Sequence, residues 1–178
     1  RETFGVTPQG STLQGEPLYR LEGVTLEGKH GKKLLDNISF GVCQGEVLGI
    51  AGVSGNGQGE LTHVMTGLLQ PTHGSIKLGD KDITHLSPGE ISDAGVGRTP
   101  QDRHEGTIGE LTVAENLALE NLDSYTNRGM LDRKKINEEA EKRIKDFQIK
   151  ASPNDQLRKL SGGNMQKVVL ARVLSREP

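Results

Sequence analysis

Apolar residues fall into short runs closed by glycine or polar residues in the first part of the chain, and into helical spacing later. The runs predict strands at 18–24, 37–42, 46–51, 74–78 and 94–99. Helices are predicted at 60–69, from Ser87-Pro88, at 112–121, at 132–147 and at 167–175. Strands that alternate with helices favour an α/β fold built on a parallel sheet.

Residues 1–17 differ from the rest of the chain. They are polar, rich in glycine, proline, serine and threonine, and lack any periodicity. We interpret them as an interdomain linker, which predicts that another domain precedes it. The remaining residues, 18–178, are interpreted as one domain, because their number is sufficient for a hydrophobic core.

Charge and composition exclude several classes of function. The formal net charge is −2, from 22 basic and 24 acidic residues, so nothing favours nucleic acid as a partner. No apolar run approaches the roughly 18 residues of a membrane span, and no signal peptide is recognised. Any contact with a membrane is therefore expected to go through a protein partner. Cys43 is the only cysteine, and the five histidines are too scattered to suggest a metal site.

The segment Gly52-Val53-Ser54-Gly55-Asn56-Gly57-Gln58-Gly59 has the glycine spacing of a phosphate-binding loop, and it stands between a predicted strand and a predicted helix. In such loops backbone N–H groups surround the phosphates, a lysine contacts them, and a hydroxyl binds Mg²⁺. Gln58 and Gly59 occupy the positions of the lysine and the hydroxyl. The loop is predicted to hold a nucleotide but to hydrolyse it poorly. The predicted nucleotide-binding residues are Gly52, Ser54, Gly55, Asn56, Gly57, Gln58 and Gly59.

Two other interpretations of this loop fit less well. A dinucleotide-binding fingerprint would need a third glycine where Glu60 stands, although Asp80 lies at a suitable distance. A hydrolase nucleophile elbow around Ser54 would need a glycine where Asn56 stands.

A second candidate site begins at Leu160-Ser161-Gly162-Gly163-Asn164. Ser161 is a suitable N-cap for the following helix, and the two glycines leave backbone N–H groups unobstructed at the positive end of the helix dipole. On its own the segment is most simply a capped helix after a flexible turn. Together with an upstream glycine loop it predicts an anion site.

The chain resembles the ATP-binding cassette family. The glycine loop is similar to its Walker A motif, residues 160–164 to its LSGGQ signature, and Gln101 to its Q-loop glutamine. More narrowly, residues 100–103, 112–116 and 160–172 resemble the second cassette of tandem ATPases that serve importers of simple sugars and nucleosides.

The resemblance implies a P-loop NTPase (RecA-like) core with an antiparallel β subdomain and a helical subdomain at about 102–172. It implies ATP and Mg²⁺ as ligands, catalytic roles for Gln101, Ser161, Gly162 and Gly163, and Gln101 as a metal ligand. It also implies two partners, namely another cassette, the first domain of the same parent chain, and transmembrane permease subunits. The protein would then lie on the cytoplasmic face of the membrane, and its signature would act in trans on the other cassette.

The chain also departs from the family pattern. An adenine-stacking aromatic residue is missing before Leu35, and the sequence stops at Pro178, before the Walker B acids and the switch histidine. We therefore expect a truncated core with an unpaired strand edge, which alone is inactive and prone to self-association. The alternative function is a soluble, non-transport cassette protein or a regulatory nucleotide-binding module.

Overall fold

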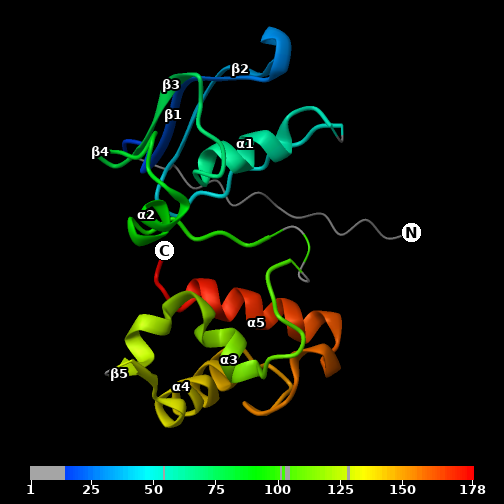
Figure 1. Cartoon of the computed structure of the whole chain (residues 1–178). Helices are drawn as coiled ribbons and strands as arrows, with labels where there is room; N and C mark the ends of the chain where they lie inside the picture. Colours follow the sequence, from blue (N-terminus) through cyan, green and yellow to red (C-terminus); the bar gives the residue numbers. More distant parts are fainter. Residues whose placement is uncertain (1–14, 54, 101, 103–104, 128) are drawn as a thin grey trace. The chain divides into compact units, whose positions relative to one another are not determined.

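The computed structural model describes residues 15–53, 55–100, 102, 105–127 and 129–178. It divides into two units, Arg1–Ala94 and Gly95–Pro178. The secondary structure of each unit is shown in Figure 1.

The first unit is built on an antiparallel sheet with strand order β2-β1-β3-β4. The strands are β1 (Tyr19–Glu27), β2 (Lys33–Val42), β3 (His73–Leu78) and β4 (Lys81–Asp82), and a 3-10 turn, η1 (Lys29–Gly31), joins the first two. Side chains from this sheet and the turn after β4 form a buried core, namely Leu21, Val24, Leu26, Leu35, Ile76 and Ile83.

Two helices accompany the sheet, α1 (Gln58–Met65) and α2 (Pro88–Asp93). Leu61 and Val64 are the buried residues of α1. The Tyr19 hydroxyl donates a hydrogen bond of 2.7 Å to the carbonyl of Met65, which ties β1 to the end of this helix, and burial raises the pKa of Tyr19. Helix α2 begins at Pro88, as the Ser-Pro start predicts, and the structure adds a capping box between Ser87 and Glu90.

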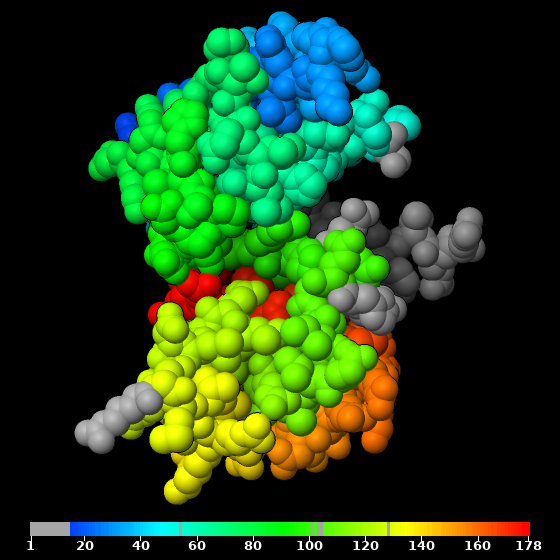
Figure 2. All heavy atoms as spheres, in the orientation of Figure 1, coloured from blue at the N-terminus to red at the C-terminus, as the bar shows by residue number. Residues whose placement is uncertain are grey.

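The second unit is helical. Its elements are α3 (Val113–Ala118), η2 (Leu119–Tyr125), the short hairpin β5 (Thr126–Asn127) and β6 (Met130–Leu131), α4 (Arg133–Asp146), η3 (Leu157–Lys159) and α5 (Gly162–Leu174). Helices α3, α4 and α5 enclose one apolar core, whose fully buried members include Val113, Leu117, Leu157 and Val168. In the space-filling view the atoms of these elements, coloured from green to red, lie against one another over the visible surface of the unit (Figure 2).

Helix starts in this unit follow the local sequence. Thr112 and Glu115 form the expected capping box of α3, in which Thr112 N–H donates to the Glu115 carboxylate at 2.9 Å. This bond, together with one from the Thr112 hydroxyl, lowers the pKa of Glu115. The predicted helix at 112–121 ends at Ala118 and continues as the 3-10 segment η2. The predicted helix at 167–175 begins earlier, at Gly162, directly after its N-cap Ser161.

The predicted parallel sheet is not present in the described residues. Residues 46–51 and 95–100 take no regular secondary structure, and every pairing between described strands is antiparallel. Val47 is 95% exposed, Ile50 53% and Val53 74%. A strand persists only where neighbours accept its backbone hydrogen bonds, and no described strand lies beside this apolar segment.

This exposed segment predicts self-association of the chain. At high concentration we expect oligomers in sedimentation velocity, because Val47, Ile50 and Val53 expose apolar side chains in a segment with no described strand beside it. Val47→Lys should shift the chain toward monomer without lowering its thermal stability, since this side chain is almost fully exposed. The control is Met130→Lys, at a 73% exposed position in the other unit, which should leave the oligomers in place. A wild-type chain that stays monomeric and unfolds cooperatively at high temperature would refute this expectation.

Candidate functional site

The glycine loop has the backbone that its sequence predicts. Gly55 and Gly57 have φ angles of 89° and 92°, a region that favours glycine. A Cβ atom on Gly57 would come within 3.0 Å of the Leu34 carbonyl oxygen and 3.2 Å of Leu35 Cδ2. Gly57 is therefore required at the N-cap of α1, both for its φ angle and for its contact with β2.

Gln58, where the lysine of a phosphate-binding loop is expected, folds back over the loop. A Cβ atom on Gly52 would collide with Gln58 Nε2, so the amide of this side chain lies against the Gly52 backbone. A neutral amide contributes one or two hydrogen bonds but no positive charge. The loop can thus offer an anion the N–H groups at the start of α1 and an amide, without a cation.

The described part of the glycine loop supplies no side-chain ligand for Mg²⁺. Gly59 has no side chain to supply the hydroxyl oxygen that a magnesium ion would use at this position. The described residues contain no group of three histidine, cysteine, aspartate or glutamate side chains able to hold a metal ion. Gln101 and Ser54 lie outside the described residues, so the roles predicted for them stay predictions.

Ser161, Gly162 and Gly163 meet at the start of α5. Ser161 has the extended backbone of an N-cap, φ −64° and ψ 154°, and its Oγ accepts hydrogen bonds from the backbone N–H and the side-chain amide of Asn164. Gly163 is exposed, and a Cβ atom there would meet no described atom within 4 Å. The first turn of α5 therefore presents a hydroxyl and open backbone N–H groups to solvent.

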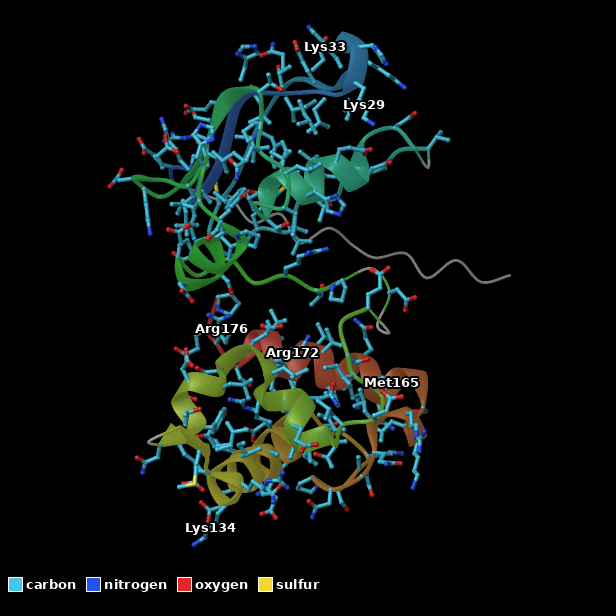
Figure 3. The ribbon with its side chains drawn as sticks, in the orientation of Figure 1. Lys29, Lys33, Lys134, Met165, Arg172 and Arg176 are labelled. Carbon is cyan, nitrogen blue, oxygen red and sulfur yellow. The ribbon has the colours of Figure 1, made fainter. Side chains whose placement is uncertain are left out.

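Arg172 fixes α5 on the side opposite to solvent. Figure 3 shows Arg172 on the same helix as Met165, further toward the C-terminus of α5. Its side chain is 6% exposed and donates to the carbonyls of Gly106 at 2.7 Å and Asn116 at 3.4 Å, while its Nε lies 2.8 Å from the Glu120 carboxylate. These contacts join α5 to α3 and to the loop that precedes it.

Asn116 holds that loop in turn. Its fully buried side chain accepts from the backbone N–H of Ile108 and donates to the carbonyls of Ile108 and Thr112, each at 2.9 Å. Sequence reasoning missed both Arg172 and Asn116 as supports of the site. The signal was available, because each polar residue stands beside apolar residues that are buried, where a polar side chain requires specific partners.

The two candidate elements belong to different units, the glycine loop to the first and the Ser161 turn to the second. Within each unit, the described candidate residues are close neighbours along the chain. Both elements can present hydrogen-bond donors to an anion, and neither includes a general acid or base among its described side chains.

Comparison with known proteins identifies relatives of the chain. A family model described as ABC transporter matches residues 35–178. The nucleoside import ATP-binding protein NupA of Lactococcus lactis subsp. cremoris is 36% identical over 182 residues, which cover 100% of this chain and 36% of that protein. The ribose import ATP-binding protein RbsA of Cereibacter sphaeroides is 37% identical over 98% of this chain and 34% of its own length. This chain thus spans about a third of these curated relatives.

A solved structure, a nucleotide-free ATP-binding cassette from an ABC transporter, superposes with a TM-score of 0.75 at 29% identity, covering 92% of this chain and 66% of that one. The predicted fold, including the antiparallel β subdomain, is confirmed by this likeness and by the four-stranded sheet. The family match covers most of the chain, from β2 to the end of the sequence. The chain therefore belongs to the ABC transporter family, as part of its ATPase cassette.

Proposed function

We propose that this chain is part of the ATP-binding subunit of an importer of simple sugars or nucleosides, and that it serves as the second cassette of a tandem protein. The observation that carries the proposal is the similarity to import ATP-binding proteins along nearly the whole chain. The subunit would couple ATP binding and hydrolysis to transport through membrane-embedded permease subunits.

The proposed subunit lies at the cytoplasmic face of the membrane and contacts it through its partners. No helix within the described residues is long and apolar enough to cross a membrane. The first cassette of the same parent chain would be its nucleotide-sandwich partner, joined through the linker at 1–17. Gln101 would connect the nucleotide site to the permease.

The two candidate elements would have unequal roles. The loop at 52–59 would hold ATP phosphates weakly, because it supplies backbone donors and the Gln58 amide but no cation. Ser161, Gly162 and Gly163 would complete the γ-phosphate site of the other cassette, where donors at a helix N-terminus stabilise the charge that develops during phosphoryl transfer. Mg²⁺ would arrive with the nucleotide and neutralise part of the charge on its phosphates.

This division of roles predicts weak ATP binding by the chain itself. Calorimetric titration with Mg-ATP should give an affinity weaker than low micromolar, and purified chain should show no turnover. Gln58→Lys should raise the affinity by about tenfold or more, since a charge-assisted contact contributes roughly 1.5 to 3 kcal/mol. Gln58→Met, of similar length but without charge, is the control and should not strengthen binding. Tight binding by the unaltered chain would contradict the prediction.

Transport itself is tested with the full-length parent protein. Its co-purification with a permease, and ATPase activity that responds to a sugar- or nucleoside-loaded binding partner in vesicles, are the expected results. A parent protein that hydrolyses ATP alone, without any membrane partner, would instead support the soluble, non-transport alternative.

A further inference from the structure

The side chain of Asn164 bridges two parts of the second unit. Its Oδ1 accepts the backbone N–H of Lys150 at 3.0 Å, and its Nδ2 donates to Ser161 Oγ at 3.1 Å. The backbone N–H of Asn164 donates to the same Oγ atom at 3.5 Å. Asn164 thus connects the segment after α4 to the N-cap of α5.

The orientation of this amide follows from its partners. A backbone N–H can only donate, so the oxygen of Asn164 faces Lys150 and its NH₂ group faces Ser161. A serine hydroxyl has two acceptor lone pairs and one hydrogen. Because both N–H groups of Asn164 point at the lone-pair side of Ser161 Oγ, the hydroxyl hydrogen is directed away from the helix. Within the described part of the chain the Ser161 hydroxyl donates to no protein group.

The segment that anchors Asn164 is itself fixed. Ile149 is buried at 5% exposure, and its N–H donates to the Ile144 carbonyl at 2.9 Å, which holds the turn after α4. Lys167, one turn further along α5 than Asn164, donates from Nζ to the Gln148 carbonyl at 2.8 Å. The Lys150 N–H is therefore held in place, and its hydrogen bond to Asn164 Oδ1 fixes the orientation of the Asn164 amide relative to Ser161.

We propose that Asn164 is a positioning residue, which presents the Ser161 hydroxyl as a hydrogen-bond donor to the γ-phosphate of ATP held by the partner cassette. The proposal rests on the function proposed above for Ser161. Asn164 itself need not contact the nucleotide. Its contribution is preorganisation: without the bridge, Ser161 could turn its hydrogen toward protein or solvent, and a donor that must reorient stabilises the transition state less well.

A double-mutant cycle in the full-length parent protein, assembled with its permease in vesicles, tests this idea. The variants are Ser161→Gly, Asn164→Leu and the pair, with steady-state kcat and KM for ATP as readouts. Glycine replaces Ser161 because it is tolerated at N-caps better than alanine. Leucine has nearly the shape of asparagine and carries no charge, and water can satisfy the exposed Lys150 N–H.

Ser161→Gly should lower kcat by about 100-fold, as the loss of one preorganised donor does elsewhere. Asn164→Leu should lower kcat roughly tenfold, because interaction energies between residues in contact are of this order. In the Ser161→Gly background, Asn164→Leu should change kcat less than about twofold, because its effect passes through the missing hydroxyl. Asn154→Leu, at an exposed asparagine, is the control and should be silent.

The outcomes separate the two proposals. If Ser161→Gly leaves kcat unchanged, the proposed role of the signature in trans is wrong. If Ser161→Gly is damaging but Asn164→Leu is silent, or lowers kcat equally in both backgrounds, positioning by Asn164 is overturned. A matching fall in melting temperature with Asn164→Leu, in both backgrounds and without the kinetic coupling, would assign to Asn164 a structural role only.

Discussion

Gly163→Asp in the full-length parent protein, assembled with its membrane subunits, should lower the steady-state ATPase rate by about 100-fold or more. Gly163 stands in the first turn of α5, and its exposed backbone faces open space. A carboxylate there would be placed against the γ-phosphate of the partner's nucleotide, so two like charges would meet where N–H donors are needed. Colorimetric measurement of released phosphate gives the rate.

Gly163→Ala is the matched control for this variant. A Cβ atom at this position meets no described atom within 4 Å, and alanine favours helix more than glycine does. Its ATPase rate should therefore fall much less than that of Gly163→Asp, which separates the effect of charge from that of size. Gln58→Ala should reduce the rate only modestly. If Gln58→Ala is more damaging than Gly163→Asp, or if the latter is silent, the proposed division of roles is wrong.

Leu117→Ala should lower the free energy of unfolding of residues 95–178 by about 2 to 5 kcal/mol. Leu117 is 2% exposed and lies in the core that α3 shares with α4 and α5. Truncation of a buried leucine removes apolar contacts and leaves a cavity, which the surrounding helices fill only in part. Native-state hydrogen exchange of the amides in α4 and α5 measures the change in this unit directly.

Leu174→Ala is the corresponding control, since Leu174 ends α5 and is 50% exposed. It should change the same exchange free energies by less than about 0.5 kcal/mol. Equal losses of protection in both variants would mean that the core is not centred on α3.

Local chemistry was sufficient to predict much of this fold. The helix start at Ser87-Pro88, the capping box at Thr112 and the N-cap at Ser161 each depend on atoms only a few residues apart. Helix α4 likewise follows from its periodic apolar residues, Ile136 and Ala140, between charged ones. These features depend on short-range hydrogen bonds and on side-chain spacing, both of which a sequence displays.

Features that depend on distant partners could not be predicted in the same way. Residues 46–51 have the composition of a buried strand, yet strand formation requires a neighbour, and the sequence does not show which segment supplies it. The contacts that hold α5 in place could not be predicted from the sequence either, because Arg172 binds the carbonyl of Gly106, 66 residues away along the chain. The folding of Gln58 over Gly52 depends on the rotamer of one side chain.

Arg172 donates hydrogen bonds to main-chain carbonyl oxygens, and this affects which sequence positions should change together within the family. The carbonyls of Gly106 and Asn116 are present whatever side chains stand at those positions, so substitutions there need no matching change at position 172. Lysine cannot replace the arginine, because it lacks the planar fork that serves several acceptors at once. Among the described residues, Glu120 is the side-chain partner, through its carboxylate 2.8 Å from Arg172 Nε. Statistical covariation between positions should therefore report the pair 120 and 172 and overlook the two backbone contacts.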